Sequence, residues 1–138
     1  DKLRIAALEA TLDAYARNAT TSELPTHQMI SMSFNELESR ATNFIAQIKA
    51  SNASDLSFEI VEGESAIGGG AAPTSRLRTP LISINHAQRS ANQIEELLRQ
   101  SDPPVIARIE DDRVLLDLRT VAADDETSLT AAVTSLGQ

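Results

Sequence analysis

The strongest constraint on the fold is the regular alternation of side chains between Val105 and Arg119. If Asp111 and Asp112 form a two-residue turn, the flanking residues pair so that one face of a hairpin is wholly apolar. Its apolar pairs are Ile109 with Val114, Ala107 with Leu116, and Val105 with Leu118. The other face pairs Glu110 with Arg113 and collects Arg108, Asp117 and Arg119 beside Ile106 and Leu115. A shift of one residue would mix the two faces, so the segment predicts a hairpin in this register, with the turn type left open.

Hydrophobic spacing elsewhere predicts helices around this hairpin. We expect helices over about 2–17, over about 34–50 after a Ser33-x-x-Glu36 capping box, after a Ser90 cap, and after Asp124 or Asp125. Pro103 and Pro104 should stop the third helix, and Asn18 should end the first. We expect 19–33 to be a linker with at most one short extended or helical piece.

Two further strands complete the predicted sheet. Alternation predicts a strand over 56–60 that Gly63 closes, and a second short strand over 80–85. The connection between them, 63–79, is long enough to suggest a function of its own. The sequence therefore predicts an α+β fold of two layers, a small antiparallel sheet with helices packed mainly on one face.

Composition excludes several kinds of site. The 138 residues contain no cysteine and only two histidines, His27 and His86, which have no partners at ligand spacing. We therefore expect no metal site and no thiol chemistry. No segment is long and apolar enough to cross a membrane, so we expect a soluble, cytoplasmic protein. The net charge of −8 means that any contact with nucleic acid must be local.

Glycines and arginines supply the candidate binding residues. Gly68, Gly69 and Gly70 could bring backbone N–H groups close to a phosphate, although a plain connector is the simpler interpretation. Arg76 and Arg78 flank this loop.

Arg108 and Arg119 share the polar face of the hairpin, and a guanidinium suits a carboxylate or phosphate ligand. The competing interpretation is that both simply satisfy Asp117, which is the stronger account for Arg108 and about equal for Arg119 at the strand end. Glu62 and Glu64 fit a solvated strand edge better than an acid–base pair. Lys2 and Lys49 both occupy contexts typical of solvated helices.

Three stretches resemble one family when they are taken together. They are DKLRIAALEATLDAY, EGESAIGGGAAP and, most specifically, DPPVIARIEDDRVLLDLRTV. In order and spacing these blocks are similar to the C-terminal part of bacterial selenocysteine synthase, the L-seryl-tRNA(Sec) selenium transferase family. The similarity is weakest over 19–26 and 51–55.

The resemblance implies a fold-type I enzyme dependent on pyridoxal 5'-phosphate (PLP), whose large domain carries the Schiff-base lysine upstream of Asp1. It implies that residues 1–18 form a helix leading from that domain and that 19–138 form the small C-terminal domain. Such an enzyme converts seryl-tRNA(Sec) to selenocysteinyl-tRNA(Sec) with selenophosphate, as a homo-oligomer. This chain alone should then be inactive, with Gly68 to Gly70, Arg119 and Arg108 the parts expected nearest the substrate.

Two alternatives remain open. The chain could come from a selenium-independent, lyase-like PLP paralogue, which would lack binding to tRNA(Sec). It could also be an interaction domain without a cofactor.

Overall fold

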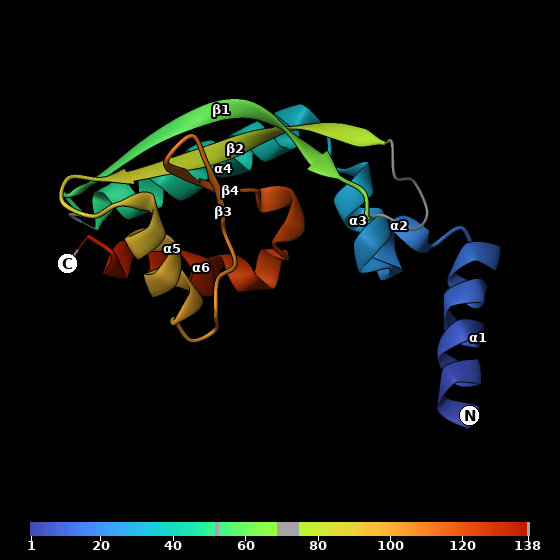
Figure 1. Ribbon diagram of the computed structural model, residues 1–138. Coiled ribbons are helices and arrows are strands. Elements are labelled where there is room, and N and C mark those ends of the chain that lie inside the picture. The colour runs from blue at the N-terminus through green and yellow to red at the C-terminus, as the bar shows by residue number, and fades with distance from the viewer. Residues whose placement is uncertain (52, 69–74, 138) are drawn as a thin grey trace. The chain divides into compact units, whose positions relative to one another are not determined.

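The computed structural model describes residues 1–51, 53–68 and 75–137, which divide into two compact units, 1–33 and 34–138. Figure 1 shows the order of the elements along the chain. The predicted division after residue 18 concerns the domains of a whole protein and stays a prediction. Within this chain the contacts divide after Ser33.

The first unit consists of three helices. They are α1 (Lys2–Ala16), α2 (Thr20–Glu23) and α3 (Pro25–Ser31). The prediction of a first helix is confirmed, and Asn18 ends it in the left-handed region with φ 55°. The prediction that 19–33 is mostly linker is wrong, because Pro25 begins a second short helix rather than breaking one. The Tyr15 hydroxyl lies 2.6 Å from Nε2 of His27, which links α1 to α3.

The second unit is a four-stranded antiparallel sheet with helices. Its elements are α4 (Phe34–Ala50), β1 (Leu56–Ala66), β2 (Arg76–His86), α5 (Ala91–Arg99), β3 (Arg108–Glu110), β4 (Arg113–Leu116), the 3-10 turns η1 (Leu118–Thr120) and η2 (Ala123–Asp125), and α6 (Glu126–Ser135). The strands lie in the order β1-β2-β4-β3. The predicted α+β class and antiparallel sheet are confirmed.

The hairpin has the predicted register. Ile109 pairs with Val114, and Glu110 with Arg113, across Asp111 and Asp112. Both aspartates have positive φ, 50° and 57°, which is the conformation of a type I' turn. The ladder is shorter than expected, because 105–107 lie before β3 and Leu118 begins a 3-10 turn.

β1 and β2 are longer than predicted. β1 continues through Gly63 to Ala66, and β2 already begins at Arg76, so the connecting loop is correspondingly shorter. A side chain at residue 63 would bring its Cβ to 2.3 Å from Cδ1 of the buried Leu81. Gly63 therefore allows close packing between the strands rather than ending β1.

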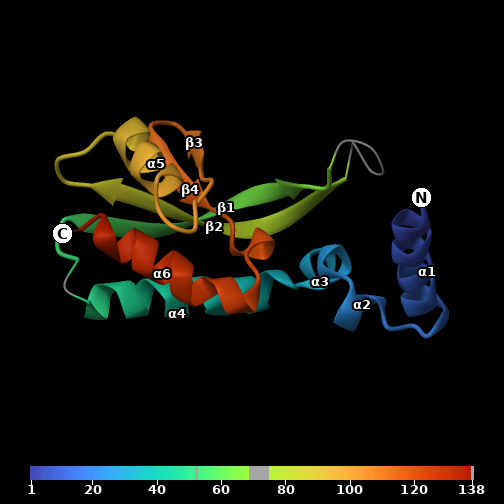
Figure 2. The ribbon, with the colours of Figure 1, turned by 90° about the horizontal axis from the view of Figure 1, so that it is seen from below.

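The core lies between the sheet and its helices. Even-numbered residues of β1, β2 and β4 share the face toward the helices, among them the fully buried Ile82, Ile84 and Val114. Figure 2 shows α4 and α6 running side by side along this layer, and α5 packs against β3 and β4. Burial of each such side chain stabilises the fold by about 1.5–3 kcal/mol.

Helix starts follow the predictions in part. Ser90 accepts a hydrogen bond from the Gln93 backbone N–H, and the Gln93 side chain accepts one from the Ser90 N–H, which completes a capping box. Asp125 precedes α6 but makes no side-chain capping bond, because the chain enters this helix through a 3-10 turn.

Candidate functional site

A half-buried carboxylate joins β1, β2 and the segment after β4. Asp117, between β4 and η1, accepts hydrogen bonds from Ser65 Oγ at 2.5 Å and Thr79 Oγ1 at 3.0 Å. It also accepts one from the Arg119 backbone N–H at 3.0 Å. Thr79 is fully buried and Ser65 nearly so. We call this group the Asp117 cluster; it fixes the far ends of β1 and β2 to the segment after β4.

Arg119 lies within the same packed region. Its side chain is only 4% exposed, and Nη2 donates to the backbone carbonyl of Arg78 at 2.9 Å. A guanidinium held in this way supports the strand that it contacts and presents little surface to a ligand.

Arg108 of β3 contacts β1 at Glu64, the residue that faces Arg78 in the β1–β2 ladder. Its exposed side chain donates through Nη1 to the carbonyl of Glu64, at 3.4 Å. Glu64 and Arg78 face each other in the β1–β2 ladder. The two arginines predicted as site residues therefore contact the same pair of facing residues. The buried Arg119 contacts Arg78, and the exposed Arg108 contacts Glu64.

This arrangement differs from the expected satisfaction of Asp117 by two guanidinium groups. Arg108 donates to the Glu64 carbonyl, and the Asp117 carboxylate accepts hydrogen bonds from the hydroxyls of Ser65 and Thr79. No periodic pattern pointed to these hydroxyl partners, since Ser65 falls within the segment predicted as loop. Thr79, a polar residue directly before the predicted apolar strand, is the sequence feature that could have indicated one of these partners.

An exposed ion pair borders the cluster on the helix side. Arg78 Nε donates to Glu62 at 2.8 Å, and its guanidinium lies 5.3 Å from the centroid of the Phe34 ring. The hydrogen bond from Arg78, and then its charge, lower the pKa of Glu62. The same bond raises the pKa of Arg78. Both side chains are well exposed, so the pair orders the surface more than it stabilises the fold.

The opposite face of the sheet carries a groove of about 450 Å³. Apolar residues and charged residues of both signs line it. The lining residues are Val61, Glu62, Gly63, Glu64, Arg76, Leu81, Arg108, Glu110, Asp111, Arg113 and Leu115. Because Arg108 is exposed on its wall, the groove offers guanidinium N–H donors to an anionic ligand.

The other predicted residues lie in varied places. Gly68 follows the end of β1 and is exposed, whereas Gly69 and Gly70 lie outside the described residues. His86 ends β2 at the opposite end of the sheet, 3.1 Å from the Leu136 carbonyl. Lys2 and Lys49 are exposed on helices, and neither lines the groove.

The described part of the chain holds neither a cluster of metal ligands nor a helix of membrane-spanning length. No group of three or more histidine, cysteine or carboxylate side chains in 1–51, 53–68 and 75–137 is arranged to hold a metal ion. No helix in those ranges is long and apolar enough to cross a membrane.

The fold and the groove define a small α+β domain with a charged groove on one face of its antiparallel sheet. The family model for L-seryl-tRNA selenium transferase matches residues 1–122. The chain therefore belongs to that family, which confirms the resemblance carried by the three sequence blocks.

Curated relatives agree with this assignment. The chain is 40% identical over 134 residues to L-seryl-tRNA(Sec) selenium transferase of Geotalea daltonii, which covers 96% of this chain and 29% of that protein. It is 38% identical to the protein of the same name from Geobacter metallireducens, covering 99% of this chain and 30% of the relative. The match to the Aliarcobacter butzleri protein is 34% identical and covers 91% and 26%. The chain thus spans less than a third of these relatives.

Proposed function

We propose that this chain is the C-terminal domain of a cytoplasmic, homo-oligomeric transferase that converts seryl-tRNA(Sec) to selenocysteinyl-tRNA(Sec) with selenophosphate. The observation that carries the proposal is the family match over residues 1–122. The names of the relatives favour this reaction over that of a selenium-independent paralogue. They equally favour it over an interaction domain without a cofactor.

We assign the cofactor PLP and its Schiff-base lysine to the part of the polypeptide outside this chain. PLP supplies the electron sink for such chemistry when it is bound. The two lysines of this chain are exposed and neither lines the groove, so residues 1–138 do not fit a Schiff-base site. We accordingly assign no step through the cofactor to them, and expect the chain alone to be inactive.

The role that we propose for this domain is to hold the acidic substrate. Within the described residues Arg108 makes one long hydrogen bond, at 3.4 Å. A phosphate oxygen of the tRNA could take the place of the Glu64 carbonyl and form a stronger, charge-assisted hydrogen bond. Arg119 is nearly buried, so we assign it the positioning of the Arg78 backbone rather than a contact with the substrate. Gly68 to Gly70 remain candidates for the substrate side.

The first experiment is spectroscopic and uses the full-length polypeptide. We expect an aldimine absorbance band that borohydride abolishes, with pyridoxal mapped to a lysine outside residues 1–138. A correctly folded protein without this band after addition of PLP would refute the PLP transferase. A band without measurable binding to tRNA(Sec) would favour the selenium-independent paralogue.

The second experiment tests the arginines in the same full-length protein. We expect Arg108→Ala to weaken tRNA(Sec) binding and to reduce the dependence of log K on log salt by about 0.7–0.9, the value for one phosphate contact. Arg99→Ala is the matched control, because Arg99 is an exposed arginine of α5 paired with Glu95. Equal binding by both variants would exclude the phosphate contact of Arg108.

Arg119→Ala separates positioning from structure. We expect it to lower the rate of the reaction and to weaken tRNA binding, because the Arg78 end of β2 loses its support. A variant with lower stability but unchanged kinetics and tRNA binding would show that Arg119 has no role in the site.

A further inference from the structure

Arg113, the first residue of β4, contacts two carboxylates without donating a hydrogen bond to either. Its Nη1 lies 3.8 Å from Oε2 of Glu59, and its Nη2 lies 3.8 Å from Oδ2 of Asp111. Both distances exceed the range of an N–H···O hydrogen bond, about 2.7–3.2 Å. Glu110, which faces Arg113 in the ladder, makes no ion pair with it among the described residues. The Arg113 guanidinium therefore keeps N–H donors that the described part of the chain does not use.

Arg108 is a second guanidinium with weak contacts on the same face of the hairpin. It faces Leu115 in the β3–β4 ladder, and Arg113 lies two residues before Leu115. Residues two apart along a strand share a face, so the two arginines are diagonal neighbours with Cα atoms about 7–8 Å apart. Both line the groove, and Arg108 is held there by its 3.4 Å hydrogen bond to the Glu64 carbonyl. Two long side chains at this separation can reach one ligand.

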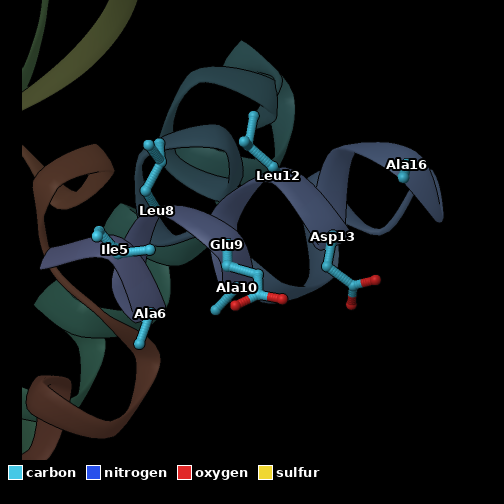
Figure 3. Close-up of a pocket in the computed structure, with 8 residues that line it drawn as sticks. All are labelled: Ile5, Ala6, Leu8, Glu9, Ala10, Leu12, Asp13 and Ala16. Atoms are coloured by element: carbon cyan, nitrogen blue, oxygen red, sulfur yellow. The ribbon is translucent and has the colours of Figure 1, made fainter. Parts of the chain in front are cut away.

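Other surface depressions in residues 1–51, 53–68 and 75–137 lack such donors. Figure 3 shows the one on α1, where the apolar Leu8 and Leu12 project from one side of the helix. The carboxylates of Glu9 and Asp13 project from another side. Neither this depression nor those lined by α4 with α6 and by the segment at Pro103 has an arginine or lysine among its lining residues. An anion therefore finds guanidinium donors in the groove rather than in these places.

The carboxylates that contact Arg113 are more exposed to water than Arg113 itself. The side chains of Glu59 and Asp111 are 67% and 82% exposed, against 35% for Arg113. Exposed ion pairs contribute little to stability, because water and salt screen them. A ligand that accepts hydrogen bonds from the guanidinium can therefore displace these carboxylates at a small cost. The same carboxylates repel further anions, so the groove suits one anionic group rather than a row of them.

A phosphate group matches these donors, because its oxygens accept the paired N–H groups of a guanidinium. We propose that Arg108 and Arg113 together hold one backbone phosphate of the tRNA in the groove. Carboxylates outnumber arginines among the lining residues, so one guanidinium alone does not hold the phosphate, and loss of either arginine releases it. The proposal rests on the proposed function, which supplies tRNA as the ligand, and it gives Arg113 a part in that contact.

The affinity of the full-length protein for tRNA(Sec), measured at several salt concentrations, tests the pair. We expect Arg113→Ala to weaken binding about threefold to tenfold, as for the net loss of one hydrogen bond. It should also reduce the dependence of log K on log salt by about 0.7–0.9, the value for one phosphate. The double variant Arg108→Ala/Arg113→Ala should lose no more than either single variant, because all three release the same phosphate. Losses that multiply, or a salt dependence reduced by about 1.4–1.8, would overturn the shared phosphate.

A second variant should change binding in the opposite direction, so a damaged fold cannot mimic its effect. Glu59→Gln removes a carboxylate that competes for Arg113 and should therefore strengthen binding of tRNA(Sec). Glu38→Gln is the matched control, because Glu38 is exposed on α4, does not line the groove and loses the same charge. We expect Glu59→Gln to strengthen binding at least about twofold more than Glu38→Gln, as for release of one exposed ion pair. Equal effects of the two variants would overturn the role of Arg113.

The outcomes separate this contact from the proposed function. Absence of tRNA(Sec) binding by the unsubstituted protein would overturn the proposed function and this contact with it. Normal binding that neither Arg113→Ala nor Glu59→Gln changes would overturn this contact alone and leave the proposed function standing.

Discussion

Removal of the Asp117 carboxylate should be the most damaging single change in the polar part of this domain. Asp117→Ala deletes the acceptor of three hydrogen bonds at once, from Ser65, Thr79 and the Arg119 backbone. The Thr79 hydroxyl is fully buried, so it cannot turn to solvent for a replacement acceptor.

The expected loss follows from the number and kind of these bonds. A hydrogen bond to a charged acceptor contributes about 1.5–3 kcal/mol net, and three bonds that share one acceptor contribute less than three times that. We therefore expect Asp117→Ala to lower the free energy of unfolding by about 3–5 kcal/mol. Asp117→Asn keeps the shape and one acceptor oxygen, so its loss should be about half as large.

Urea denaturation of the 138-residue chain, followed by far-UV circular dichroism, measures both losses. A double-mutant cycle between Asp117→Ala and Ser65→Ala should give a coupling energy of about 1–2 kcal/mol, because the two side chains share one bond. A loss below about 1 kcal/mol for Asp117→Ala would refute the reasoning. It would mean that water reaches these hydroxyls and that the cluster does not join the strand ends.

Three other predictions concern local features of the second unit. Gly63→Ala should lower the free energy of unfolding by about 1–3 kcal/mol, because its Cβ would overlap a buried leucine. In Gly68→Ala the new Cβ meets no heavy atom of the described residues within 4 Å, so urea denaturation should show almost no change. Ser90→Ala should cost about 1 kcal/mol through loss of the α5 capping box, and Ser90→Asp should restore most of it. Because Arg78 lowers the pKa of Glu62, the stability from this pair is present above about pH 4.5 and is lost as the pH falls through the lowered value. Carboxyl NMR titrations should show the Glu62 midpoint moving up in Arg78→Gln, and an unmoved midpoint would contradict the pairing.

The hairpin could be predicted to the residue because two independent constraints coincide there. The alternation of apolar and polar residues allowed one register, and two aspartates at its centre tolerate the positive φ of the turn. Ile109 opposite Val114 then followed from counting. The prediction failed only at the ends of the ladder, where Leu118 begins a 3-10 turn and no alternation signals the change.

The lengths of β1 and β2 could not be predicted by the same means. Glycine is common at strand ends, but the role of Gly63 depends on Leu81, a residue of the next strand whose side chain packs over it. Pro25 was similarly ambiguous, since proline both interrupts helices and begins them. In each case a local signal had two structural meanings, and a contact from elsewhere in the chain decided between them.

The candidate site shows the same limit at the level of roles. Arg108 and Arg119 could be selected from the sequence because both lie on the polar side of one hairpin. The difference in their burial could not be predicted. The 3-10 turn directs Arg119 inward to the Arg78 carbonyl, whereas Arg108 stays on the surface. A periodic pattern assigns a residue to one face of a strand, whereas the burial of its side chain depends on the backbone conformation after the strand ends.

The charges around the groove limit how much tRNA affinity this domain can contribute. Three arginines line it, Arg76, Arg108 and Arg113, together with four carboxylates, and the chain as a whole carries a charge of −8. Long-range attraction of a polyanion is therefore absent, and a phosphate can be held only by a guanidinium that already points into the groove. If this domain contacts tRNA, the contact must be short-ranged and must orient the substrate more than it binds it. Loss of Arg108 should then affect the position of the acceptor end, and hence the rate, more than the total affinity.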